Sequence, residues 1–533
     1  MQTRTVLHTP SNTLIKGDAS VSKARYLEDW LVFAVTFALN LAMVWVVVFH
    51  LGIFVTDAMA RTRSAWQVFF SAEPKLTNVG FVWSPLPTIL QFPLVLLPPL
   101  RVNGISGNLV TAVMGAGTAV LLNSLARSEG WPRIGRFLLV TAFALNPMVL
   151  FYSANGMSEM TLIFFSVWTI LLWLDWCRTR RRVLLIWMGV ACSLAFLSRY
   201  DALVLATILC ILVFWFSRRD PERKRGEAEG SMLAFAAPVG YATFMWVYFN
   251  WTIMGDPLYF ATSPYSNAGQ INYQLAVLPN IAEMKHDLPR TACAILQQLW
   301  QLFPPFILLS VGLAVLVARR RDPVGLGLLA VAWSFPLFTW LNLFMGQSAL
   351  FLRYFILAIP TAFLLGVWIA PRLGHFKLAG SSIVPLLGLS AVITGLTMEQ
   401  ASDWGQWNDI FIRSLLRNER VEIWAPEKEL ASYINGRVHG REVLVDDFQG
   451  YRVIFFSGHP EYFCTPADGD FQEVLRRPYG KVTYILSSSR ELEGSLNQVN
   501  IAYPTLYANG GSWVVLEKES WVWKLYRVVG QPE

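Results

Sequence analysis

The sequence predicts a mainly α-helical membrane protein, in which a polytopic helical bundle precedes a C-terminal α/β domain. Of its 533 residues, 54% are hydrophobic and only 15% are charged, and the mean hydropathy is +0.43. Soluble globular proteins carry roughly 25% charged residues. Apolar stretches of about 20 residues, long enough to cross hydrocarbon, recur through the first three quarters of the chain. From about residue 400 the composition becomes that of an ordinary soluble domain.

Individual spans follow from these apolar stretches. The first, 30–55, is longer than a signal-peptide core and lacks a convincing cleavage site, so we expect a retained helix. The others give a bundle of about eleven spans: 107–126, 134–153, 158–176, 183–198, 201–217, 232–251, 298–318, 324–345, 354–370 and 378–397.

The basic residues fix the expected orientation. They gather in the short loops 127–136, 178–182, 218–225, 319–321 and 372–377. With a cytoplasmic N-terminus, all of these loops are cytoplasmic, as the positive-inside rule requires. Because the basic residues are distributed among short loops in this way, the net charge of +7 does not indicate a nucleic-acid partner. The apolar stretch 84–100 then cannot cross the membrane. Its five prolines remove backbone donors, and we expect a re-entrant or interfacial segment.

Three parts of the chain are expected on this basis. They are a cytoplasmic tail (1–29), a transmembrane domain (30–399) and an extracytoplasmic α/β domain (400–533). In the last of these, the residue patterns predict strands at 442–446, 482–486, 512–516 and 521–528, with helices at 427–434 and 471–476.

Asp57 is the first candidate for chemistry, because it directly follows the first span and opens a long outer loop. A carboxylate at a membrane face is a candidate functional residue, since the neighbouring hydrocarbon penalises unpaired charge. Arg61 lies one helical turn further on and could pair with it. The structural alternative is that Asp57 caps a helix.

Other charged residues fall at further outer turns. Glu159 follows the turn 153–158, where an acid also suits the start of a helix. Arg199 and Asp201 join two spans and could neutralise each other. Arg353, followed by Tyr354, has no acidic neighbour in sequence. Its guanidinium suits bidentate phosphate binding, or it reaches the membrane surface by snorkelling.

The long loop 252–300 begins with the turn Gly255-Asp256-Pro257, and Tyr259 follows it. Aromatic residues here and in the first outer loop suit a platform for lipid or sugar rings. They also fit the aromatic belt of a membrane protein. Asp446 and Asp447 end a predicted strand, where we expect a turn.

Absent motifs narrow the function. No Walker loop or HExxH motif occurs, the outer loops of the transmembrane domain contain no Asp-x-Asp, and the five cysteines show no ligand spacing. We therefore expect no disulfide framework, no zinc site and no cofactor, while a divalent metal stays open.

Together these landmarks resemble the GT-C class of membrane glycosyltransferases, which use polyprenyl-phosphate sugars. The class includes protein O-mannosyltransferases and the aminoarabinose transferases of lipid A. The resemblance covers roughly residues 30–400. Its landmarks are Asp57 after the first span, the long first outer loop, Glu159, Arg199-Tyr200-Asp201, Asn250 with Gly255-Asp256-Pro257, and Arg353-Tyr354 leading to Pro360.

The resemblance implies an enzyme of the bacterial inner membrane. It implies that Asp57 is a general base for an acceptor and that Arg353, with Arg199, holds the donor phosphate. Glu159 would orient the acceptor or support a cationic side chain, and transfer would invert the anomeric carbon. The implied partners are a polyprenyl-phosphate sugar, membrane lipid and a protein, lipid or glycan acceptor. The substrate-binding set would be Glu159, Arg199, Asp201, Arg353, Tyr354, Arg61 and Tyr259.

Two departures concern the acceptor. Protein O-mannosyltransferases carry an Asp-Glu pair where this chain has Asp57-Ala58, and an arginine where it has Asn155. Both departures argue against mannosyl transfer to protein. The alternatives from other functional classes are a flippase or transporter for lipid-linked glycans and a noncatalytic membrane scaffold.

Overall fold

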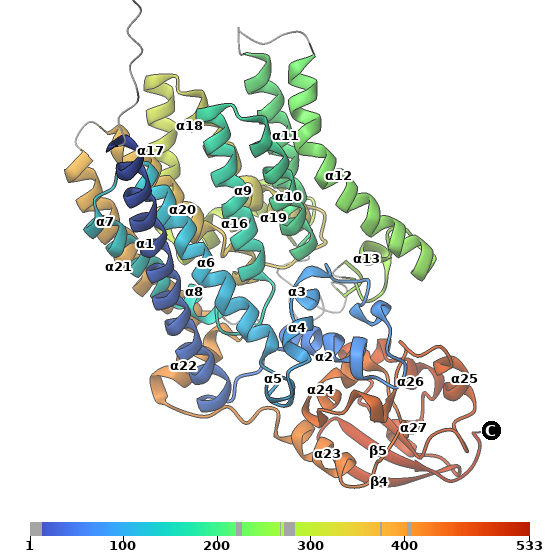
Figure 1. The fold of residues 1–533 in the computed structure, drawn as a ribbon. Helices are drawn as coiled ribbons and strands as arrows, with labels where there is room; N and C mark the ends of the chain where they lie inside the picture. The colour runs from blue at the N-terminus through green and yellow to red at the C-terminus, as the bar shows by residue number, and fades with distance from the viewer. Residues whose placement is uncertain are drawn as a thin grey trace, which may run out of the picture.

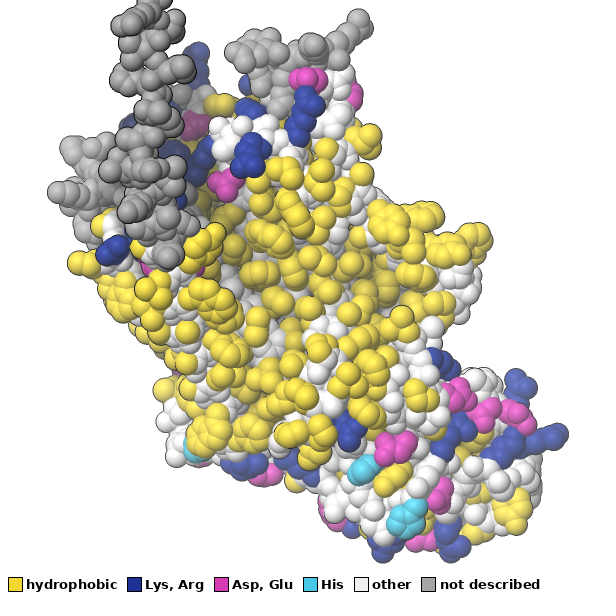
Figure 2. Space-filling model, in the orientation of Figure 1, with side chains coloured by type: hydrophobic (Ala, Val, Ile, Leu, Met, Phe, Trp, Pro, Cys, Tyr) yellow, Lys and Arg dark blue, Asp and Glu magenta, His cyan; other side chains and the backbone are white. Residues whose placement is uncertain are grey.

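The computed structural model describes residues 13–219, 226–266, 268–270, 283–373, 376–401 and 407–532. Long helices stand side by side in a bundle, and the C-terminal region (residues 407–532) lies at one end of it (Figure 1). Hydrophobic side chains cover the flank of the bundle as a broad band. Charged side chains gather at its far end and on the C-terminal region (Figure 2). This separation is the pattern expected of a bundle that sits in a membrane.

The bundle contains helices from both halves of the chain. Their bounds are α1 Thr13–Val44, η1 Trp45–His50, α6 Ser106–Ser128, α7 Arg133–Ala144, α8 Pro147–Tyr152, α9 Glu159–Thr179, α10 Arg182–Ser198, α11 Ala202–Arg218, α12 Glu227–Met254, α16 Leu288–Leu302, α17 Pro304–Arg320, α18 Pro323–Ala332, α19 Ser334–Phe344, α20 Ala358–Ile369 and α21 Phe376–Gln400.

Six helical segments of the described chain are long and apolar enough to cross a membrane, and the number rises to eight if two bent pairs are single spans. Each predicted span has a helical counterpart. The predicted spans 183–198 and 201–217 correspond to α10 and α11, which have 17 residues each and fall just short of that length. The count of about eleven spans therefore stays a prediction.

The predicted span 298–318 is not one straight helix. It divides into α16 and α17, whose axes differ by 110°. Pro304 begins α17, and Phe303 before it has an extended backbone with φ −152° and ψ 79°. A proline lacks the backbone donor that a continuing helix needs, and it disfavours helical backbone in the residue before it.

The proline-rich stretch 84–100 forms only short helices, as its prolines predict. They are α3 Leu86–Ile89, α4 Phe92–Val95 and α5 Pro98–Val102. None is long enough to cross a membrane, which agrees with the predicted non-spanning segment. Its depth relative to a membrane stays a prediction.

Ion pairs tie several loops together at the end of the bundle away from the C-terminal region. Arg136 and Arg127 bond to Glu28 and Asp29 on α1, while Arg178 and Arg372 bond to Glu129. We call these three acids and four arginines the distal cluster. Basic loops that the sequence places on one side thus lie together.

The C-terminal region contains a five-stranded mixed sheet in the order β2-β1-β3-β5-β4. β1 is parallel to β2 and β3, whereas β5 is antiparallel to β3 and β4. The bounds are β1 Val443–Leu444, β2 Phe463–Cys464, β3 Tyr484–Ser488, β4 Val514–Ser520 and β5 Trp523–Val528, with helices α22 Asn408–Arg417, α23 Ala425–Asn435, α24 Asp447–Ser457, α25 Phe471–Arg476, α26 Gln498–Ala502 and α27 Leu506–Asn509.

Most predicted elements of this region have a counterpart. The four predicted strands correspond to β1, β3, β4 and β5, and the two predicted helices correspond to α23 and α25. Sequence reasoning missed β2, because a two-residue strand carries too few residues to show alternation. The boundaries of the three predicted parts, 1–29, 30–399 and 400–533, stay predictions.

The C-terminal region packs against helix α2, Thr56–Phe70, which follows the first span. Trp66 of α2 stacks on Phe455 of α24 with ring centroids 5.1 Å apart. The Trp424 indole donates to the carbonyl of Phe54 over 3.0 Å. Helix α2 therefore lies between the bundle and the C-terminal region (Figure 1).

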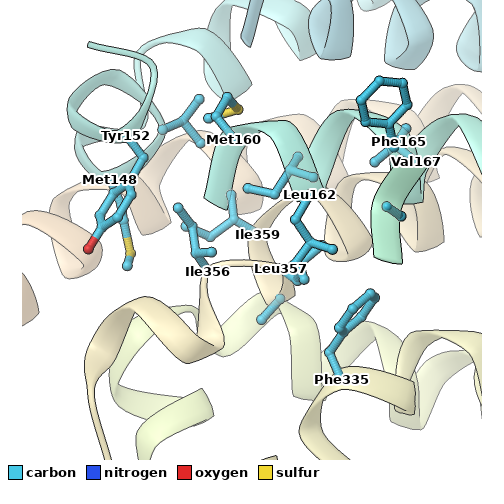
Figure 3. Packing of buried hydrophobic residues seen from close by; sticks show 14 of the residues in the cluster. Met148, Tyr152, Met160, Leu162, Phe165, Val167, Phe335, Ile356, Leu357 and Ile359 are labelled. Carbon is cyan, nitrogen blue, oxygen red and sulfur yellow. The ribbon is translucent and has the colours of Figure 1, made fainter. Parts of the chain in front are cut away.

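Buried apolar side chains hold the bundle together just behind Arg353. Ile356, Leu357 and Ile359, which follow Arg353 in the chain, lie close to Leu162 of α9 and Tyr152 of α8 (Figure 3). Side chains fixed by such packing have few rotamers available. The segment that carries Arg353 is consequently held in place by the buried residues that follow it in the chain.

Candidate functional site

Asp57 lies in the first turn of α2 and does not cap its own helix. Its carboxylate accepts a hydrogen bond of 2.8 Å from Arg353 Nη1, although the two residues are 296 positions apart. Arg353 sits in the short 3₁₀ segment η3, Leu352–Phe355. A third of the Asp57 side chain is exposed, and 12% of that of Arg353. The pair is thus accessible from the side of Asp57.

Glu159 begins α9 directly beyond the turn 153–158, and its side chain is buried. Gly156 in this turn has φ +81°, and a Cβ there would lie 3.1 Å from the Cβ of Ala58. Glycine is the residue that tolerates both the backbone and the contact. This close approach places the start of α9 beside the start of α2.

Charged groups form a continuous line from Asp57 inward. Glu159 Oε1 lies 3.8 Å from Arg353 Nε and accepts a hydrogen bond of 2.8 Å from Arg199 Nη1. Arg199 Nε in turn donates to Asp201 over 3.1 Å. We call Asp57, Arg353, Glu159, Arg199 and Asp201 the ionic row.

Arg61 lies beside the row and does not pair with Asp57 through a hydrogen bond. Its Nη1 donates to the carbonyl of Ser84 over 3.0 Å, and its guanidinium lies 4.9 Å from the centre of the Trp83 ring. Trp83 is 38% exposed. Arg61 therefore fixes a partly exposed aromatic ring next to the charged residues.

Two tyrosines support the row. The guanidinium carbons of Arg353 and Arg199 lie 5.4 and 5.5 Å from the centre of the Tyr354 ring. The Tyr200 hydroxyl donates to the carbonyl of Val82 over 3.1 Å and lies 3.2 Å from the indole nitrogen of Trp246. Tyr354 thus packs against both arginines, while Tyr200 ties the turn of Arg199 to the first outer loop.

The charges balance within this cluster. Burial by itself would raise the pKa of Asp57, but Arg353, Arg61 and Arg199 outweigh it and lower the pKa below its usual value. Burial lowers the pKa of Arg61 to about 10, although Asp57 and Glu159 oppose this. Burial also opposes the charge of Arg199, yet Asp201 and Glu159 raise its pKa. These groups are therefore ionised near neutral pH.

Two buried atoms of the row lack a hydrogen-bond partner within the described structure. They are Glu159 Oε2 and Arg353 Nε. A buried polar group without a partner costs about 1–3 kcal/mol, and more when it is charged. The row therefore has unused hydrogen-bonding capacity on both an acid and an arginine, which suits a site that takes up a charged ligand.

Tyr259 is the one predicted site residue that the structure does not bring to the row. It is half-buried near Asp447, and both burial and that carboxylate raise the pKa of its hydroxyl, against a hydrogen bond with Ser263. After the turn Gly255-Asp256-Pro257 the chain enters the short helix α13, Tyr259–Thr262, in which Phe260 packs on Tyr200 with ring centroids 4.9 Å apart. No described hydrogen bond or ion pair joins Tyr259 to the row, and its role as a residue of the same site stays a prediction.

Sequence reasoning also missed the role of Asp446 and Asp447 in the structure. Asp446 caps α24 by accepting from the backbone of Phe448, and Asp447 forms an ion pair with Arg63 of α2. Arg63 and Asp447 are 384 positions apart. No sequence pattern links residues at that separation, so a single sequence carries no signal for this pair.

The arrangement suits anions more than metal ions. Within the described residues, no group of three or more His, Cys, Asp or Glu side chains could hold a metal. Arg353, Arg199 and Arg61 instead surround Glu159 and Asp57. Guanidinium groups present paired donors that match phosphate oxygens.

Comparison with known proteins gives a family match to part of the chain and a fold for almost all of it. Residues 98–241 match the family described as dolichyl-phosphate-mannose-protein mannosyltransferase. The crystal structure of ArnT from Cupriavidus metallidurans bound to undecaprenyl phosphate matches with a TM-score of 0.58 and 13% identity, over 95% of this chain and 99% of that one.

The apo crystal structure of the same ArnT matches with a TM-score of 0.56 and 13% identity, over 94% of this chain and 99% of that one. No curated protein sequence gives a significant match. The predicted resemblance to GT-C membrane glycosyltransferases that use polyprenyl-phosphate donors is therefore confirmed, through the family match and through the fold of almost the whole chain.

Proposed function

We propose that this protein is a glycosyltransferase of the bacterial inner membrane. It would move a sugar from a polyprenyl-phosphate donor to an acceptor on the extracytoplasmic side, by a single displacement that inverts the anomeric carbon. The support is the GT-C fold together with an ionic row at the end of the bundle that also carries the C-terminal region. The basic loops lie at the opposite end, which favours a cytoplasmic N-terminus.

In the proposed reaction, Asp57 takes the proton of the acceptor hydroxyl or amine. The acceptor atom then bonds to the anomeric carbon as the bond from that carbon to the donor phosphate oxygen breaks. Negative charge moves onto the departing polyprenyl phosphate. Arg353 and Arg199 stabilise it there, because positively charged guanidinium groups held in fixed positions attract the negative charge that develops in the transition state.

One observation carries this proposal, namely the 2.8 Å contact between Asp57 and Arg353. In it a carboxylate that is one-third exposed, the proposed base, lies beside a guanidinium, the proposed phosphate-binding group. A lipid-linked donor fits this location, since nucleotide sugars are cytoplasmic and the row would face outward.

The test is transfer by purified protein from an undecaprenyl-phosphate sugar to outer-surface acceptors. Asp57→Asn should lower the rate at least about 100-fold, the typical contribution of a general base. Glu419→Gln, an exposed acid outside the row, serves as the matched control and should keep full activity. Full activity of Asp57→Asn would reject the base, and retention of the donor's anomeric configuration would reject single displacement.

The same assay separates the rival functions. A flippase or transporter would move the lipid-linked sugar without consuming it, and a scaffold would do neither. Consumption of the donor with release of undecaprenyl phosphate, dependent on Asp57, supports transfer. Mass spectrometry of outer-surface glycans with and without the protein then identifies the sugar and the acceptor.

A further inference from the structure

Arg353 lies between two carboxylates but forms a hydrogen bond with only one of them. Its Nη1 donates to Asp57 over 2.8 Å, whereas its Nε stays 3.8 Å from Glu159 Oε1. The second distance is too long for a hydrogen bond. In this structure Arg353 therefore satisfies the candidate base and leaves Glu159 partly unsatisfied.

One of the two unpartnered atoms of the row, Arg353 Nε, belongs to this second contact, and the other, Glu159 Oε2, is the second oxygen of the same carboxylate. Arg353 Nε and Glu159 Oε2 are both buried and lack a partner within the described residues. A rotation of the Arg353 side chain that brings Nε within hydrogen-bond distance of Glu159 would give Nε a partner, and a bond to Oε2 would satisfy both atoms. The same movement would lengthen the bond to Asp57, so two arrangements of one arginine compete.

The observed arrangement opposes catalysis by Asp57. The charged groups around this carboxylate are Arg353 of η3, Arg61 of α2, Arg199 of the turn after α10, and Glu159 of α9. Among the arginines, Arg353 has the largest effect in lowering the pKa of Asp57. A carboxylate held by an arginine is a weak base, because binding a proton would lose that interaction.

A donor phosphate changes the balance. Its negative charge competes with Asp57 for the guanidinium donors of Arg353. Once phosphate oxygens occupy the Nη donors, Nε is left as the donor nearest Glu159. Glu159 is anchored for this role by its 2.8 Å bond to Arg199.

We propose that Glu159 is a positioning residue that receives Arg353 when the donor phosphate binds, which frees Asp57 to take the acceptor's proton. This inference rests on the proposed function and adds regulation to the same site. It gives the reaction an order, since the base becomes competent only with the donor in place. Activation of water or of an acceptor at an empty site is thereby suppressed.

The first test compares two pH profiles of the wild-type enzyme with an undecaprenyl-phosphate sugar. The profile of kcat/KM for the donor reports the pKa of the base in the free enzyme, and that of kcat reports it in the donor complex. We expect the acid limb of kcat at a higher pH, by about one pH unit, because one opposite charge has left the carboxylate. Coincident limbs, or a lower limb for kcat, would overturn the proposal.

Variants of the row show whether Glu159 causes this separation. Glu159→Gln removes the charge that receives Arg353, so the two acid limbs should converge. Glu159→Asp keeps the charge and should restore a separation. Asp201→Asn is the matched control, since it removes another carboxylate of the row that is not in contact with Arg353, and should keep the limbs apart. Unchanged separation in Glu159→Gln contradicts the role of Glu159.

A second measurement covers a Glu159→Gln protein too inactive for kinetics. Carbodiimide labelling of Asp57, read by mass spectrometry, should rise when undecaprenyl phosphate is added to the wild type and should not rise in Glu159→Gln. A fall in wild-type labelling, or an equal rise in both proteins, overturns the proposal. Failure of the proposed function is distinguishable, because the wild type would then consume no lipid-linked donor, or Asp57→Asn would retain full transfer, whatever the labelling shows.

Discussion

The ionic row and the distal cluster are built from the same residue types, but they differ in how fully their acids are paired. In the distal cluster, all six carboxylate oxygens of Glu28, Asp29 and Glu129 accept a hydrogen bond. In the ionic row, one oxygen of Glu159 is buried without a partner, and Asp57 is one-third exposed. The carboxylate oxygens are thus fully paired in the distal cluster and only partly paired in the ionic row, whereas each of the two regions has one buried arginine nitrogen without a partner in the described structure, Arg127 Nη1 or Arg353 Nε.

This difference separates structure from function. Fully paired carboxylates fix the positions of helices, because any movement breaks hydrogen bonds to charged groups. A carboxylate with a free oxygen keeps capacity for a ligand, and a buried acid without a full set of partners calls for an explanation such as binding or reaction. The distal cluster should therefore matter for stability and the ionic row for transfer.

The largest expected effect is a loss of transfer activity on substitution in the ionic row, which substitution in the distal cluster should not cause. Arg353→Ala should lower kcat/KM for the lipid-phosphate donor by about 100- to 1000-fold, since it removes a charge that stabilises the leaving phosphate. Steady-state transfer at varied donor concentration measures it. Arg417→Ala, an exposed arginine outside the row, is the control. An unchanged donor dependence would assign Arg353 to structure alone.

The matching arginine-to-alanine substitution in the distal cluster is Arg136→Ala. Arg136 donates to both oxygens of Glu28 and to the carbonyl of Trp131. Arg136→Ala should lower the free energy of unfolding by about 2 kcal/mol, the contribution of a hydrogen bond to a charged group. Transfer per folded molecule should not change. Equal losses in Arg136→Ala and Arg353→Ala, in both stability and transfer, would remove the distinction between the regions.

A third prediction concerns the contact between α2 and the C-terminal region. Burial, and then the neighbouring Asp447, raise the pKa of Asp446 to about 7, against two backbone hydrogen bonds and Arg63. The folded state therefore binds a proton more tightly than the unfolded chain, whose aspartate has a pKa of about 3.9. The stability due to this proton is present below about pH 4 and is lost as the pH rises through about 7.

Unfolding of the C-terminal region should show this pH dependence, followed by hydrogen exchange of α24 between about pH 4 and 8. In Asp446→Asn, whose amide oxygen can still cap α24, the pH dependence should flatten. An unaltered slope in the variant would mean that other groups control it.

The smallest effect is expected at Tyr259. Because this residue lies near Asp447 and not at the row, Tyr259→Phe should change the donor KM less than about twofold, within the range of a substitution away from the bound groups. Donor titration of the variant checks this. A large rise in the donor KM would return Tyr259 to the donor site that its sequence position first indicated.

Sequence reasoning found the residues of the ionic row but not their pairing. Asp57, Glu159, Arg199, Asp201 and Arg353 all follow or precede apolar spans, so sidedness alone predicts that they share one face. That Arg353 bonds to Asp57 depends on how η3 and α2 meet across 296 positions. A single sequence carries no signal for packing between residues so far apart in the chain.

The same limit applies to the fold. The lengths of the apolar stretches predicted spans that all contain helices in the structure. The prolines of 84–100 predicted that this segment is not one continuous helix. The 110° bend between α16 and α17 was not predicted. Pro304 and Pro305 lie inside an apolar stretch, and the sequence does not show whether such prolines begin a new helix or merely lie within one span. The pair Arg63–Asp447 and the placement of Tyr259 depend on how the C-terminal region docks, which tertiary contacts decide.

Asp57 and Arg353 are proposed to act as one transfer site, and a double-mutant cycle tests this most directly. Transfer would be measured for Asp57→Asn, Arg353→Ala and the double variant with an undecaprenyl-phosphate sugar. Residues that act as a unit lose activity non-additively. We predict that the double variant is no slower than the slower single variant. Losses that multiply would show two independent contributions and contradict a single site.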